Sequence, residues 1–84
     1  NKVCVITIRG PDGVELGGNV TFSCDLFNEP LSDLMWRKYL NYNLSMVKNI
    51  MPTNLPDRFT INNTYINGAY SISTLTITNV LAED

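Results

Sequence analysis

The sequence predicts an all-β fold, and three observations favour this class. Short runs of β-branched and aromatic residues recur along the chain, and some of them alternate polar with apolar residues. Clusters of glycine, proline and asparagine separate these runs at short intervals. No stretch longer than about one turn has the i, i+3, i+4 apolar spacing of an amphipathic helix. From 84 residues we therefore expect a single domain built of strands.

Two strands are expected near the N-terminus. Residues 3–8 are dense in β-branched residues and end at the turn cluster 10–13, which cannot continue a strand. Residues 19–24 alternate polar and apolar side chains, which predicts a strand with one face toward the core. The side chains on that core-facing side are Val20, Phe22 and Cys24.

Two more strands are expected in the centre of the chain. Residues 34–40 predict a strand in which Trp36 and Leu34 face inward. Residues 44–50 predict a weaker strand. The prolines within 52–56 break the chain there, which is typical of the edge of a sheet.

The last two expected strands lie in the C-terminal third. Residues 58–61 form the first, and a turn at 67–68 precedes the second, at residues 72–78. The clearest alternation in the sequence is in 72–78. It directs Leu75 and Ile77 inward and the threonines toward solvent.

Charge and composition argue against several classes of function. The six basic and eight acidic residues give a net charge of -2 and lie singly, so no basic stripe for nucleic acid is present in the sequence. The longest apolar runs are far shorter than the roughly 20 residues that cross a bilayer, so we expect no membrane insertion by this segment. The sequence has no histidine, no glycine-rich phosphate loop and no clustered acidic motif. We therefore expect no enzymatic activity, no cofactor and no metal.

Three motifs follow one another in a distinctive order. Cys24 ends the second expected strand, and Trp36 follows it by twelve residues. The triplet Asp57-Arg58-Phe59 opens a later strand, and residues 75–84 read Leu-Thr-Ile-Thr-Asn-Val-Leu-Ala-Glu-Asp. Together these motifs resemble the immunoglobulin superfamily, V-type or the related I-type, over nearly the whole chain.

The resemblance implies an immunoglobulin-like β-sandwich of two antiparallel sheets, V-set like. Residues 1–84 would supply its strands A to E and the E–F corner. The resemblance also implies that Trp36 packs against an inter-sheet disulfide and that Arg58 pairs with Asp84 to brace one corner. The F and G strands are absent from this chain, so the sandwich is incomplete and we expect the protein to continue beyond Asp84.

The two cysteines, Cys4 and Cys24, have no metal-ligand spacing, which indicates disulfide use in an oxidising compartment. The resemblance implies that Cys24 bonds a cysteine beyond Asp84. Two pairings stay open for Cys4. A bond to Cys24 is conceivable because the first strand of this fold runs beside the second, whereas a bond to a strand beyond Asp84 is the favoured expectation.

Three asparagines, Asn19, Asn43 and Asn62, stand in the N-x-S/T pattern of glycosylation acceptors. All three fall in expected loops or at strand starts that face solvent. We therefore expect at least one of them to carry a glycan.

The strand at 34–40 offers a binding surface, because an inward Trp36 directs its neighbours Met35, Arg37 and Tyr39 outward. Met, Arg and Tyr are enriched where proteins meet proteins. The residues expected to extend this surface are Tyr42, Met46 and Met51. The alternative is that these are scattered surface residues without a common role.

The resemblance implies an extracellular recognition or adhesion domain of a cell-surface receptor. Its partner would be another cell-surface or secreted protein, including a second copy of itself, in self/non-self or immune-type recognition. One alternative is a secreted immune effector or viral decoy that captures a ligand, and another is a structural spacer domain. The expected location is extracellular, either in the ectodomain of a single-pass membrane protein or in secreted form.

Overall fold

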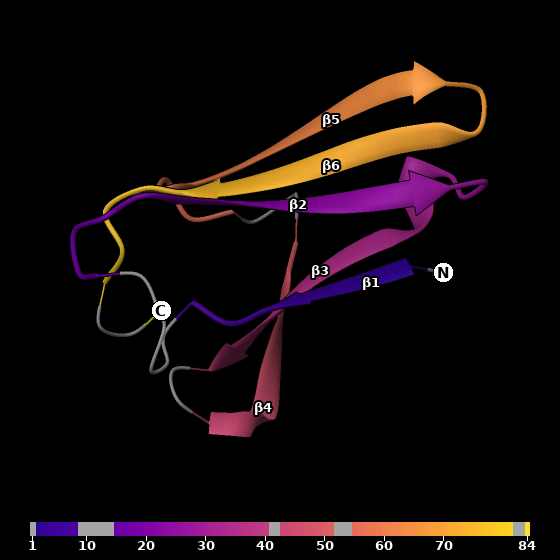
Figure 1. The fold of residues 1–84 in the computed structure, drawn as a ribbon. Helices are drawn as coiled ribbons and strands as arrows, with labels where there is room; N and C mark the ends of the chain where they lie inside the picture. The colour runs from indigo at the N-terminus through magenta and orange to yellow at the C-terminus, as the bar shows by residue number, and fades with distance from the viewer. Residues whose placement is uncertain (1, 9–14, 41–42, 52–54, 82–83) are drawn as a thin grey trace.

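The computed structural model describes residues 2–8, 15–40, 43–51, 55–81 and 84. Within these ranges the chain forms a sandwich of two three-stranded sheets (Figure 1). This confirms the all-β class predicted from the sequence.

The strands divide between the sheets as follows. Sheet I has the order β1–β3–β4 and consists of β1 (Lys2–Ile6), β3 (Leu34–Leu40) and β4 (Asn43–Ile50). Sheet II has the order β2–β6–β5 and consists of β2 (Val20–Phe27), β6 (Tyr70–Ile77) and β5 (Phe59–Asn67). Every described strand pair is antiparallel except β1 with β3, which is parallel.

The position of β1 differs from the expectation that the first strand runs beside the second and that both sheets are antiparallel. β1 lies in sheet I, where its register runs from Lys2 opposite Leu34 to Ile6 opposite Lys38. Parallel neighbours require a crossover connection. β2 in sheet II and the 3-10 turn η1 (Leu31–Asp33) lie on that crossover, which returns the chain to sheet I in the direction of β1.

The β5–β6 hairpin is longer than the sequence predicts. β5 continues past residue 61 to Asn67, although asparagine is unfavourable in strands, because its residues pair with β6 along this whole length. The hairpin turns at Gly68, and its tip lies at the same end of the sandwich as the start of η1 (Figure 1).

The core lies between the two sheets, and the predicted inward residues occupy it. Leu75 and Ile77 are fully buried, and Val20, Phe22 and Leu34 pack against the core partly buried. The buried apolar side chains are Ile6, Ile8, Cys24, Leu26, Trp36, Ile50, Phe59, Leu75, Ile77 and Val80.

Candidate functional site on the outer face of sheet I

A disulfide joins Cys4 of β1 to Cys24 of β2, with the two Cα atoms 6.3 Å apart. The favoured expectation that both cysteines bond residues beyond Asp84 is therefore wrong, and the pairing left open as the alternative is present. The reason is the position of β1. Because β1 lies in sheet I, Cys4 faces Cys24 across the core, and its Cα partner in sheet I is Trp36.

The bond thus links the two sheets beside the buried tryptophan. A small all-β domain with two sheets and a disulfide is consistent with an immunoglobulin-like fold. The disulfide also indicates an extracellular or secreted location, since such bonds persist in oxidising compartments.

Trp36 has the inward position expected of it. It is 3% exposed, and its indole N–H donates a hydrogen bond to the Ser73 hydroxyl of β6 at 3.1 Å. A buried polar group without a partner would cost free energy. This one bond satisfies the indole and also engages the hydroxyl of Ser73, and it holds the ring between the two sheets.

Arg58 and Asp84 form the ion pair expected at the corner of the sandwich. The Arg58 Nη1 and Nη2 donate to the Asp84 carboxylate at 2.8 and 3.1 Å, and the Leu81 N–H donates to the same carboxylate at 2.8 Å. Burial opposes ionisation of Asp84, but these hydrogen bonds and the charges of Arg58 and Lys38 outweigh it and lower the pKa of the carboxyl. The pair has a structural role, because it holds the chain after β6 against β5.

The outer face of sheet I presents Met35, Arg37 and Tyr39, as the alternation of β3 predicts. All three side chains are partly exposed, whereas Trp36 and Lys38 between them are buried. The Arg37 Nε donates a hydrogen bond to the Asn49 side chain of β4 at 2.8 Å, which links the two strands on this face. The residue types of a protein-binding surface are therefore in place on this face.

Two valines of β1 join this surface. Val3 and Val5 are 39% and 47% exposed, and their Cα partners in β3 are Met35 and Arg37. Sequence reasoning missed them because it placed β1 in the other sheet. The period-two geometry of a strand was the signal, because an inward Cys4 directs Val3 and Val5 away from the core. We call Val3, Val5, Met35, Arg37 and Tyr39 the sheet I face.

A shallow hollow of about 300 Å³ lies at one end of the sheet I face. Its lining includes Lys2 and Arg37, which are basic, and Asp33 of η1, which is acidic. Both signs of charge thus border the exposed Val3, and a polar rim around an apolar centre is typical of interfaces.

The remaining predicted partner residues do not extend this surface. Tyr42 and the side chain of Met46 lie outside the described residues. Met51 is 44% exposed, but it borders a small cleft of about 80 Å³ together with the inward-facing Lys38 and Phe59. Met51 therefore lies at the open edge between the sheets and not on the sheet I face.

Two of the three candidate glycosylation sites are described, and both are exposed. Asn62 projects from β5 on the outer face of sheet II, because its neighbour Ile61 faces the core. Asn19 precedes β2, and its side-chain oxygen accepts a hydrogen bond from the Asn79 N–H at 3.1 Å. The side chain of Asn43 lies outside the described part of the chain.

The outer face of sheet II carries an aromatic pair at its far end. The rings of Phe27 and Tyr70 stack with centroids 4.7 Å apart, and the Tyr70 hydroxyl donates to the Asp25 carboxylate at 3.2 Å. Desolvation and the negative charge of Asp25 raise the pKa of the Tyr70 phenol. The Tyr70 hydroxyl and both rings therefore have partners within sheet II, and these contacts link β2 to β6.

Within the described residues, no group of three or more metal-binding side chains comes together. The same part of the chain contains no helix with the length and apolar character needed to cross a membrane. Comparison with known proteins found no family model, no curated protein and no solved structure that matches this chain.

Proposed function

We propose that this chain is a V-like immunoglobulin recognition domain of an extracellular protein, and that it binds another protein through the sheet I face. The domain is a binding module and not an enzyme. The observation that carries the proposal is the position of Val3 and Val5, two exposed aliphatic side chains beside Met35 and Arg37. Exposed apolar groups gathered on one face and bordered by charge are typical of protein interfaces.

One of the candidate glycan positions, Asn62, supports the same face. Asn62 projects from the outer face of sheet II, so a glycan there would cover the opposite side of the sandwich. The sheet I face would stay accessible. A cell-surface receptor ectodomain is the favoured setting, and a secreted effector or decoy would use the same surface.

The test introduces one charge on each side of the sandwich. Val5→Lys places an ammonium group in the centre of the sheet I face, and Thr60→Lys, the matched control, places one at an exposed position of β5 on sheet II. Binding to cells is measured with the protein that carries this chain displayed as a multimer. Self-association is measured separately, by analytical ultracentrifugation of the same protein without the multimer.

Val5→Lys should weaken binding at least about tenfold, because the centre of an interface tolerates an unpaired charge poorly. Thr60→Lys should bind like the parent protein. Loss of a sedimenting dimer in Val5→Lys alone identifies the partner as a second copy of the chain. If Val5→Lys bound as well as Thr60→Lys, this result would contradict the proposal and favour the structural spacer.

A further inference from the structure

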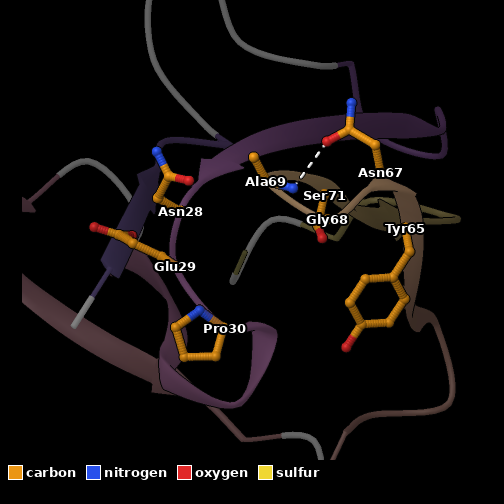
Figure 2. A pocket seen from close by; sticks show the side chains of 8 residues that line it. All are labelled: Asn28, Glu29, Pro30, Tyr65, Asn67, Gly68, Ala69 and Ser71. Atoms are coloured by element: carbon orange, nitrogen blue, oxygen red, sulfur yellow. Dashed lines mark hydrogen bonds between the residues drawn. The ribbon is translucent and has the colours of Figure 1, made fainter.

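A second hollow, of about 530 Å³, lies at the end of the sandwich opposite the Arg58–Asp84 corner. It is bordered on one side by the segment between β2 and η1 and on the other by the tip of the β5–β6 hairpin (Figure 2). Its volume is within the roughly 300–1,000 Å³ of small-molecule sites. The lining residues used below are Asn28, Glu29, Pro30, Tyr65, Asn67 and Ser71.

Backbone contacts hold the two sides of the hollow together. Asn28 has a φ of 58°, a left-handed conformation that asparagine tolerates better than most residues, and its N–H donates to the Ala69 carbonyl at 2.7 Å. The Asn67 side-chain oxygen in turn accepts from the Ala69 N–H at 2.8 Å, shown by the dashed line in Figure 2. Ala69 therefore links both walls, so the hollow is a built feature of the fold.

Tyr65 and Ser71 form the floor and one wall of the hollow. They are Cα partners, so both lie on the inward face of sheet II. Only the β5 side of this part of the face is open, since Tyr65 is 74% exposed whereas Ser71 is buried. The rings of Tyr65 and Pro30 lie on two sides of the hollow (Figure 2).

Ser71 is the least expected residue in the lining. It is 6% exposed, yet its hydroxyl has no hydrogen-bond partner within the described part of the chain. Buried hydroxyls are nearly always hydrogen-bonded. Ser71 lines the hollow, so a ligand in the hollow would supply the missing partner.

The chemistry of the lining selects the class of ligand. The Asn28 amide, the Glu29 carboxylate and the Ser71 hydroxyl bind hydroxyl groups, and no basic side chain borders the hollow among the residues that the structure describes. A single carboxylate without a basic neighbour disfavours anions. The Tyr65 and Pro30 rings add apolar surfaces against which the C–H face of a sugar ring packs.

From these observations we propose that the hollow between the β2–η1 segment and the β5–β6 hairpin binds a neutral saccharide. The proposal is independent of the protein-binding role of the sheet I face, which lies on the other sheet. Affinity should be modest, with a Kd on the order of a millimolar for one sugar ring, because the site is open and the ligand small.

The test is saturation-transfer NMR with the full-length protein. The probes are the methyl glycosides of glucose, mannose, galactose and N-acetylglucosamine, with glucuronic acid and N-acetylneuraminic acid as the anionic comparison. At least one neutral glycoside should receive saturation, and the anionic sugars should receive several-fold less. Absence of transfer to every neutral glycoside, or stronger transfer to the anionic sugars, would overturn the proposal.

Three variants locate the site. Tyr65→Ala and Ser71→Ala should each reduce the transfer at least about fivefold, while Tyr39→Ala, the matched tyrosine on the sheet I face, should leave it unchanged. Ser71→Ala should also melt at the same temperature as the parent protein or higher, because it removes a buried hydroxyl that has no hydrogen-bond partner among the described residues. Transfer that persists in both hollow variants would show that the sugar binds elsewhere and would refute the site.

These outcomes are separable from the proposed function. Val5→Lys tests protein binding and leaves the hollow intact, whereas Tyr65→Ala tests saccharide binding and leaves the sheet I face intact. Either role can therefore fail while the other stands.

Discussion

The inward face of sheet II differs between its two ends. On β5 the exposed fraction rises along this one face from 6% at Phe59 to 74% at Tyr65. On β6 the apolar Ile77 and Leu75 at one end give way to Ser73 and Ser71 at the other. We call the half around Phe59, Leu75 and Ile77 the covered end and the half around Tyr65 and Ser71 the open end.

Trp36 marks the boundary between the two ends, since its indole reaches Ser73 of β6. Where sheet I covers sheet II, the inward residues are aliphatic or aromatic and contribute to stability through burial. Beyond the tryptophan the inward residues of β5 and β6 are serine, asparagine and tyrosine, which can hydrogen-bond to water or to a ligand. One pair of strands thus supplies a core at one end and a candidate site at the other.

The largest expected effect contrasts one residue from each end. Leu75→Ala at the covered end should lower the free energy of unfolding by about 2–5 kcal/mol, because it leaves a cavity at a fully buried position. Tyr65→Ala at the open end should change it by less than about 0.5 kcal/mol. Chemical denaturation of the two variants measures both values. Similar losses would mean that Tyr65 contributes to the core and would remove the distinction between the ends.

The covered end could largely be predicted from the sequence. Strict alternation in residues 72–78 identifies Leu75 and Ile77, since period-two patterning directly reports which side of a strand meets the core. The resemblance to immunoglobulin domains also placed Trp36 inward and paired Arg58 with Asp84. These features depend on local pattern or on motifs with characteristic spacing.

The open end could not be predicted in this way. Residues 62–67 are polar and give no strand signal of their own, and β5 extends through them because it pairs with β6. The hollow needs Asn28 and Ala69 side by side, a contact between segments about 40 residues apart that no local pattern encodes. The parallel pairing of β1 with β3 is likewise a contact between distant segments. The sequence therefore did not favour it, nor the Cys4–Cys24 disulfide that depends on it.

Removal of the disulfide should have the next largest effect on the free energy of unfolding. This variant also tests whether β1 belongs to sheet I. Replacing both Cys4 and Cys24 by alanine should cost about 3 kcal/mol, the chain-entropy value for a loop of this length, with sequence separation 20. Denaturation with and without reductant measures the loss. Saccharide binding at the open end should survive under conditions where the variant stays folded, because β1 does not line that hollow.

Peptide mapping of the unreduced full-length protein checks the pairing directly. It should yield one linked pair of peptides containing Cys4 and Cys24. A peptide that links Cys24 to a cysteine beyond Asp84 would contradict this pairing and would restore the arrangement first expected from the family resemblance.

The smallest of the three effects concerns the corner at the covered end and depends on pH. The pKa of Asp84 is held below the ordinary value of an aspartate by its hydrogen bonds and by Arg58, so the ionised carboxylate stabilises the fold above about pH 4. This contribution should be lost as the pH falls through the lower pKa of the folded state. Asp84→Asn should already lose about 2 kcal/mol at pH 7, the scale of hydrogen bonds to a charged group, and should then lose less than the parent protein on acidification. Asp33→Asn, which removes an exposed carboxylate, is the control. Equal acid sensitivity of the parent and Asp84→Asn would show that the Arg58–Asp84 pair does not hold the covered end closed.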